Sequence, residues 1–187
     1  MTRNAFISNC LPAAILLTLL AVPAEAAQIV EPKHGVGLAY DEAQWSAKLD
    51  DDQNINLTCK TAACGGAGAQ CIATPQLAKQ GSTPQALLGY FGTDITRLVL
   101  GEFTKQGFDP KLVEELAIHR VGERTAGLSS FRTEDAGKLM RIWIAQVIVP
   151  FGAEVLVCVC PEDRYAAANA QWLSLIGAMA VPEDQSK

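Results

Sequence analysis

The chain has 187 residues, of which 49% are hydrophobic and 19% charged, and its 15 basic and 20 acidic side chains give a net charge of −5 at pH 7. A chain of this length can bury a substantial core within one domain. The acidic balance argues against nonspecific binding to nucleic acid or to an anionic membrane, because both favour clustered lysine and arginine.

The first 26 residues have the features of a cleaved secretory signal. Arg3 supplies a positive charge, an apolar stretch that is densest in LPAAILLTLLAV follows, and the sequence AEA ending at Ala26 offers the small residues that signal peptidase reads. Asn9 and Pro12 interrupt the apolar stretch, which is too short to span a bilayer, a task that takes roughly 20 residues. We therefore expect cleavage after Ala26, a periplasmic or secreted protein, and no membrane span in the mature chain.

The next part of the chain predicts short strands. Residues 27–35 are expected to form an extended lead-in to a single domain over 36–180, and residues 181–187 a tail. The apolar and alternating patterns predict strands in GVGLAY (35–40), WSAKL (45–49), INLTC (55–59) and CIAT (71–74). Residues 75–84 are expected to form a loop.

A helix is predicted from about Asp94 to Gln106, with Gly107 ending it. Four further strands are then predicted in LAIHRV, TAGLSSF, KLMRIWIAQVIV and AEVLVCVC. Their short connections require them to be antiparallel, since a parallel crossover needs a dozen residues or more. A last helix is predicted over about Asp163 to Met179, with a buried face formed at helical spacing by Tyr165, Ala168, Trp172, Ile176 and Met179.

These elements predict an α+β fold, in which an antiparallel sheet of about six to seven strands has helices packed on its faces. The element order and the apolar helix after AEVLVCVC resemble the PsbP-like fold, over roughly Val36 to Ala180. That fold is shared by the photosystem II extrinsic protein and a nuclear Ran-binding factor. The resemblance implies an accessory or binding protein without catalysis, and it assigns a role to no individual residue.

Removal of the signal leaves five cysteines, Cys59, Cys64, Cys71, Cys158 and Cys160. In an oxidising compartment they are expected to form structural disulfides, with one cysteine left over. The favoured pairing is Cys64 with Cys71 across the glycine-rich loop, and Cys59 with Cys158 or Cys160. A bridge between Cys59 and Cys71 is the competing pairing.

The alternative interpretation is a thiol-based redox protein or a soft-metal-binding protein that uses Cys158 and Cys160. Their spacing puts both thiols on one face of a strand, and thiolates favour soft metals. The spacings match neither a structural zinc site nor the C-x-x-C helix start of thiol oxidoreductases.

A further candidate is the face of the strand that carries Arg141 and Trp143, which with His119 is a possible ligand or partner surface. The sequence contains no assembled catalytic motif. We therefore expect a non-catalytic exported accessory or binding protein that needs no cofactor and binds an unknown protein or small ligand, with no nucleic acid as partner.

Overall fold

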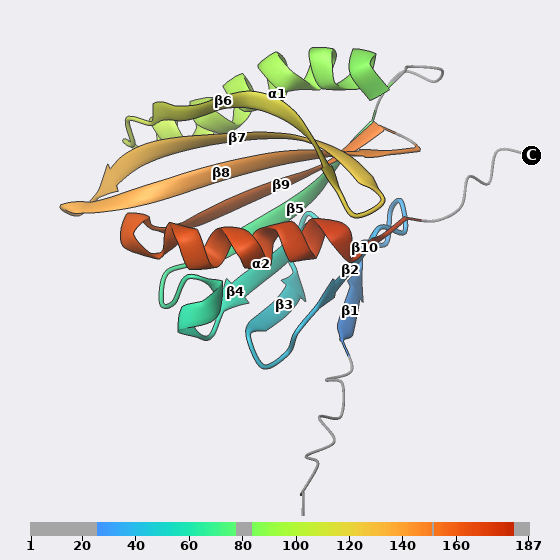
Figure 1. Ribbon diagram of the computed structural model, residues 1–187, viewed down its shortest axis with the longest axis horizontal. Helices are drawn as coiled ribbons and strands as arrows, with labels where there is room; N and C mark the ends of the chain where they lie inside the picture. The colour runs from blue at the N-terminus through green and yellow to red at the C-terminus, as the bar shows by residue number, and fades with distance from the viewer. Residues whose placement is uncertain (1–25, 78–83, 151, 182–187) are drawn as a thin grey trace, which may run out of the picture.

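A computed structural model describes residues 26–77, 84–150 and 152–181 of the chain (Figure 1). Its strands are β1 (Ala27–Val30), β2 (Gly37–Tyr40), β3 (Trp45–Leu49), β4 (Ile55–Cys59), β5 (Gln70–Leu77), β6 (Lys111–Val121), β7 (Arg124–Asp135), β8 (Lys138–Val149), β9 (Gly152–Pro161) and β10 (Met179–Ala180). Its helices are α1 (Pro84–Lys105), α2 (Tyr165–Gly177) and the short 3-10 helices η1 (Ala62–Cys64) and η2 (Glu162–Arg164).

The strands form two sheets. Seven of them make one antiparallel sheet in the order β3-β4-β5-β9-β8-β7-β6, and β1, β2 and β10 make a small second sheet. Residues 27–30 of the expected lead-in form β1, which pairs along its whole length with β2. The predicted α+β class, with helices on the faces of an antiparallel sheet, is confirmed.

The strands from β6 to β9 follow one another as neighbours, as their short connections predict. The turn between β7 and β8 shows why the connection is tight. Asp135 pairs with Lys138, so only Ala136 and Gly137 lie between the strands, with φ angles of 49° and 79°. Two residues with positive φ give a turn whose twist matches that of the strands it joins.

Helix α1 is longer than the sequence predicts. The predicted bounds of the loop over 75–84 are wrong at both ends, because β5 continues to Leu77 and α1 begins at Pro84. The helix was predicted to begin only near Asp94. Proline suits the first position of a helix, where its missing N–H needs no partner. The glycine-containing stretch GYFG hides the first turns, because glycine is a poor helix former.

Gly107 ends α1 as predicted. The Phe108 N–H donates to the Phe103 carbonyl over 3.0 Å, and the Gly107 N–H donates to the Thr104 carbonyl over 3.0 Å. Gly107 has a φ of 91°, which glycine adopts without a steric cost. The rings of Phe103 and Phe108 meet edge to face at 6.0 Å. This is the Schellman motif, in which two carbonyls of the last helical turn accept hydrogen bonds and a hydrophobic contact accompanies them.

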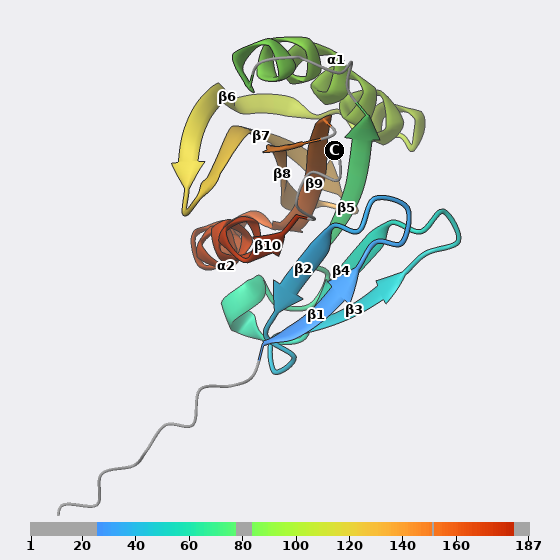
Figure 2. The same ribbon diagram turned by 90° about the vertical axis from the view of Figure 1, so that its right-hand side faces the viewer.

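The two helices lie on opposite faces of the large sheet (Figure 2). Helix α1 contributes Val99, Leu100 and Phe103 to a cluster with β7, β8 and β9. Helix α2 covers the other face and joins a larger core, which also includes β2 and the region around η1.

The predicted buried face of the last helix is largely confirmed. The helix proper is shorter than expected, because η2 precedes it and β10 follows it. Its buried side chains are Ala168, Trp172, Leu175 and Ile176. Tyr165 is half-buried, and Met179 lies in β10, where it packs into the same core.

Candidate functional site

The cysteines form two disulfides with a pairing that the sequence did not predict. Cys59 bonds to Cys64, which we call the loop disulfide, and Cys71 bonds to Cys158, which we call the sheet disulfide. The expected Cys64–Cys71 bridge, the bridge from Cys59 to Cys158 or Cys160, and the competing Cys59–Cys71 bridge are all wrong. The reason is register: β5 lies beside β9, and Cys71 sits directly opposite Cys158.

The glycine-rich loop brings the loop disulfide together. After Cys59 the chain turns through η1, which ends at Cys64, and Gly65 follows with a φ of 113°. A Cβ on Gly65 would lie 2.8 Å from the Ala69 Cβ and 3.2 Å from the Cys160 Cβ. Only glycine fits there, so the loop bends back on itself and packs on β9.

Cys160 is the free thiol in the part of the chain that the structure describes, and it lies wholly inside the core. Burial, followed by the negative charge of Glu162, raises the pKa of Cys160 to about 12. A buried thiol that stays protonated is a poor nucleophile and a poor metal ligand. Cys158 is already in the sheet disulfide, so the Cys158 and Cys160 pair offers no dithiol. Within the described ranges, no cluster of three or more His, Cys, Asp and Glu side chains could hold a metal ion.

Arg141 occupies a closed polar site beneath α2 rather than an exposed face. Its side chain is 7% exposed, and it donates hydrogen bonds of 2.9 and 2.7 Å to the two carboxylate oxygens of Glu162. The guanidinium carbon lies 4.2 Å from the centre of the Tyr165 ring, so this cation stacks on Tyr165 and not on Trp143. The hydrogen bond from Arg141 lowers the pKa of Glu162 to about 2, so this pair remains ionised at neutral pH.

The same site links three further side chains, those of Ser130, Glu114 and Tyr165. Arg141 also donates to Ser130 at 2.9 Å, and Ser130 donates to Glu114 at 2.5 Å. Tyr165 donates to Glu114 at 3.0 Å, and burial, followed by the charge of Glu114, raises the pKa of Tyr165 to about 12. We call this set the Arg141 network. Because its charges and hydroxyls pair with one another, it fastens α2 and η2 to β6, β7 and β8.

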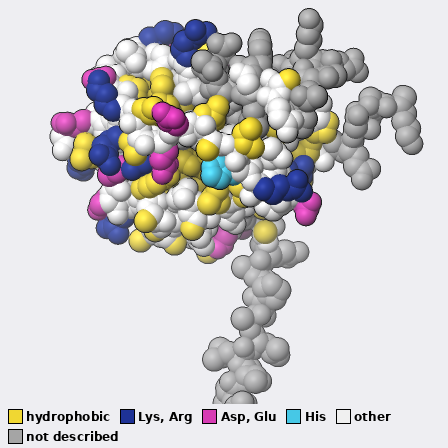
Figure 3. Space-filling model, turned by 45° about the horizontal axis from the view of Figure 1, so that its top comes forward, with side chains coloured by type: hydrophobic (Ala, Val, Ile, Leu, Met, Phe, Trp, Pro, Cys, Tyr) yellow, Lys and Arg dark blue, Asp and Glu magenta, His cyan; other side chains and the backbone are white. Residues whose placement is uncertain are grey.

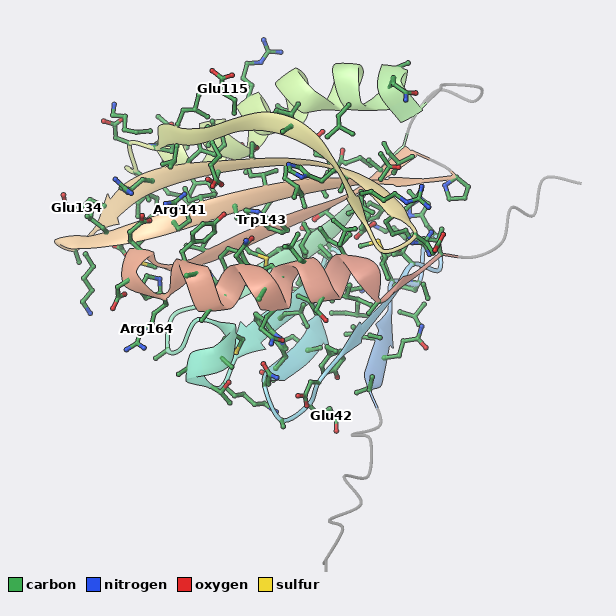
Figure 4. All side chains as sticks on the ribbon, in the orientation of Figure 1. Glu42, Glu115, Glu134, Arg141, Trp143 and Arg164 are labelled. Carbon is green, nitrogen blue, oxygen red and sulfur yellow. A yellow bond between two sulfur atoms is a disulfide. The ribbon has the colours of Figure 1, made fainter. Side chains whose placement is uncertain are left out.

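Trp143 and His119 do not join Arg141 on one surface. Trp143 is 2% exposed, and its ring lies 5.5 Å from that of Trp172 on α2. Figure 4 shows Arg141 and Trp143 between the sheet and α2. His119 lies on β6, where its side chain is exposed. The predicted ligand face of Arg141, Trp143 and His119 is therefore not one exposed surface, because α2 covers two of its three members.

Strand β6 is the exposed feature of the sheet. It ends the strand order, and the first ten of its residues are exposed. The sequence pattern predicts this strand only from Leu116 onward, whereas β6 begins at Lys111. The missed signal is that KLVEELAIHRV keeps large apolar residues without an alternating pattern that would bury one face. These exposed apolar side chains are Leu112 (55%), Val113 (41%), Leu116 (39%) and Ile118 (59%).

The side of the molecule that carries α1 and β6 shows hydrophobic side chains at the surface, with acidic and basic ones among them (Figure 3). The contacts of α1 fall mainly on β8, with fewer on β7 and β9. Helix α2 touches β6 at its inner side, where Tyr165 reaches Glu114. The outer edge of β6 and its apolar side chains therefore remain accessible.

A second unexpected feature is a buried carboxyl group on β9. Glu154 is 0% exposed, and neither of its carboxylate oxygens has a hydrogen-bond partner. Burial, followed by the charge of the nearby buried Glu31, raises the pKa of Glu154 to about 8. Glu31 itself accepts the backbone N–H of His34 at 2.7 Å, beside an open hollow of ≈ 360 Å³. The missed signal is an acid placed inside the apolar run AEVLVCVC.

Comparisons with known proteins place the fold. No protein-family model matches the sequence, and no curated protein matches it. The structure is similar to the solution structure of cyanobacterial PsbP (CyanoP) from Synechocystis sp. PCC 6803, with a TM-score of 0.62 and 10% sequence identity. The match covers 94% of this chain and 99% of that one. The fold is therefore PsbP-like, as the element order suggests, and at this identity the likeness concerns the fold alone.

Among the described residues, no helix has both the length and the apolar character that crossing a membrane requires.

Proposed function

We propose that this protein is an exported, non-catalytic accessory protein that acts by binding another protein chain along β6. The observation that carries the proposal is the accessible outer edge of β6, whose backbone ends the sheet and whose apolar side chains are 39 to 59% exposed. Unpaired strand edges with exposed apolar side chains are places where another chain adds a strand.

Export is supported by two features. Residues 1–26 have the pattern of a signal that is cleaved after Ala26, which would place the protein in the periplasm or outside the cell. The loop and sheet disulfides need an oxidising compartment. We propose that the mature chain is one domain over 36–180, with the strand-forming lead-in 27–35 before it and the tail 181–187 after it.

A binding role is also favoured by how the ionisable groups are arranged. The side chains with the largest pKa shifts are Glu154, Cys160, Glu162 and Tyr165. Glu162 and Tyr165 belong to the Arg141 network, and Glu154 and Cys160 are wholly buried. Strongly shifted groups in an enzyme are expected in an open cleft. In this protein, Glu162 and Tyr165 instead hold elements of the fold together, and Glu154 and Cys160 are enclosed in the core.

The test is isolation of the tagged, full-length chain from cells that export it. We expect the mature protein to begin at Ala27 by mass spectrometry, and to carry a second protein chain with it in a fixed ratio. The variant Ile118→Lys should lose that chain, because a charge replaces an apolar side chain in the middle of β6. The matched control is Leu139→Lys on β8, which alters an equally exposed leucine (52%) away from β6. Retention of the second chain by Ile118→Lys, or isolation of the tagged chain as a monomer with neither another protein nor a second copy bound, contradicts the proposal.

A further inference from the structure

The sequence of β6 has a symmetry about Ala117 that concerns the identity of its partner. From Val113 to Val121 it reads V-E-E-L-A-I-H-R-V, with valine at both ends and Leu116 and Ile118 on either side of Ala117. The acids stand on the N-terminal side of the centre and the bases stand on the C-terminal side. When such a strand is reversed, its apolar positions coincide and its charges change sign.

An antiparallel pair of identical strands related by a two-fold axis must place one residue opposite its own counterpart. With Ala117 on the axis, Leu116 of each copy lies opposite Ile118 of the other, and Val113 lies opposite Val121. Moving the axis by one residue, to Leu116 or to Ile118, sets charged side chains opposite apolar ones. Apolar pairs and opposite charges across two strands stabilise a sheet, so Ala117 marks the best register.

The charges agree with the same register. Glu115 of one copy lies opposite His119 of the other, on both sides of the axis. Glu114, whose carboxylate also accepts from Ser130 and Tyr165 within its own chain, lies opposite Arg120. Arg120 already binds Glu123 at 3.1 Å, but this ion pair is exposed, with side chains 64% and 95% accessible, and holds the arginine weakly.

The irregularities of β6 do not remove this match. Its pairing with β7 shifts between Leu112 and Glu114 and again between Glu114 and Ala117, while the pairs from Ala117 to Val121 are regular. A bulge displaces the facing residues by one position, and after such a displacement one acid still lies opposite one base on each side of the axis. Strand edges that avoid association usually carry charges that repel a second copy, whereas the charges here attract one.

We propose that the partner of β6 is a second copy of this chain, and that the two β6 strands pair antiparallel about a two-fold axis at Ala117. The seven-stranded sheet then continues across two copies, and the two exposed apolar patches cover each other. A contact of this kind is isologous, with the same surface on both sides, which is the commonest symmetry of protein dimers. This inference rests on the proposed function, since it names the chain that β6 binds.

The experiment is sedimentation of the purified mature protein at concentrations up to about 100 µM, a range that detects a dimer of modest affinity. Two variants are made at facing positions, Glu115→Lys and His119→Glu. The first places two basic side chains opposite one another and the second places two acidic ones, in each case at two symmetric places, so each should raise the dissociation constant by about tenfold or more. Both residues are exposed, so the fold should be kept, and circular dichroism and urea unfolding check this.

The decisive sample is an equal mixture of the two variants. In the mixed dimer Lys at position 115 faces Glu at position 119, and the unchanged Glu115 faces the unchanged His119. We expect the mixture to recover dimers that neither variant forms alone, and Leu139→Lys to dimerise as the wild type does. A wild type that stays monomeric, variants that dimerise as well as the wild type, or a mixture without recovery would each overturn the inference.

Failure here and failure of the proposed function have different signatures. A monomeric wild type together with a different protein bound through Ile118 in exporting cells overturns the self-pairing and supports the proposed function. A monomeric wild type with no bound chain overturns both.

Discussion

The buried carboxyl of Glu154 should make the stability of this protein fall as the pH rises through neutrality. Glu154 has no hydrogen-bond partner and faces the charge of Glu31, so the folded chain holds its proton up to a pKa of about 8. In the unfolded chain the same group titrates near its ordinary value of 4.5. Between these values the folded chain binds more protons than the unfolded chain, and the free energy of unfolding decreases with pH.

The size of the effect follows from that difference. Each pH unit in the interval removes about 1.4 kcal/mol, so the upper limit for the whole interval is about 5 kcal/mol. The stabilising contribution of the proton is complete below about pH 4.5 and has been lost above about pH 8. This is a large fraction of the stability of a typical domain, which is about 5–15 kcal/mol.

The variant Glu154→Gln tests this directly, because glutamine has nearly the same shape and does not ionise. We expect the free energy of unfolding of Glu154→Gln, relative to the wild type, to rise steadily from pH 5 to pH 8. Urea unfolding at each pH, followed by the fluorescence of the buried tryptophans, measures this difference. The control Glu42→Gln alters an exposed acid and should keep the wild-type slope.

A difference between Glu154→Gln and the wild type that stays constant from pH 5 to pH 8 would refute this reasoning. It would mean that Glu154 has an ordinary pKa in the folded chain and is therefore hydrated or paired.

Three further predictions concern the core. Replacing Arg141 with glutamine should lower the free energy of unfolding by about 3–5 kcal/mol in urea titrations, since it leaves the carboxylate of Glu162 without its buried cationic partner. The control Arg132→Gln alters a side chain that is 45% exposed and should lower the free energy of unfolding by about 1 kcal/mol or less. Equal losses would contradict the structural role of the Arg141 network. Replacing both cysteines of the sheet disulfide with alanine should lower the free energy of unfolding by about 2–3 kcal/mol more than the same change in the loop disulfide, because the bridged residues are 87 positions apart rather than 5. Thermal unfolding that finds the loop-disulfide variant the less stable of the two would contradict this expectation. Cys160 should react with a thiol reagent only after denaturant is added, and rapid labelling of the native protein would show that it is not enclosed.

The sequence predicted best the parts of the fold whose signals are local. The strands from β6 to β9 were recognisable because each apolar run is separated from the next by a short turn, and such turns allow only antiparallel neighbours. The end of α1 at Gly107 and the buried face around Trp172 depend on residues within two helical turns. Side chains a few positions apart determine these features, so one sequence is enough to see them.

The cysteine pairing could not be read in the same way. It depends on β5 lying beside β9, and these strands are far apart in the chain. The glycines at positions 65, 66 and 68 favour a bridge between Cys64 and Cys71, because they let a short loop bend back on itself. The structure instead places Cys71 opposite Cys158, at a separation that local patterns do not encode.

The prediction that Arg141 lies on an exposed face was wrong for a related reason. The alternation along β8 correctly put Arg141 and Trp143 on one face, and both side chains do lie under α2. The error was to regard that face as exposed, since the position of α2 on the sheet depends on long-range packing. Helix α2 brings Tyr165 to the guanidinium, and η2 brings Glu162. The uncovered surface lies instead at the end of the sheet, on β6.

The most direct test of the account is a photo-activated cross-linker placed at position 118 on β6 in the exported protein, with the same group at position 139 on β8 as control. Illumination of intact cells should give a discrete cross-linked product from position 118, in which the second chain is attached next to the strand edge. Position 139 should give none. A product of the same yield from both positions, or no product from position 118, would contradict the claim that this protein acts by binding another chain along β6.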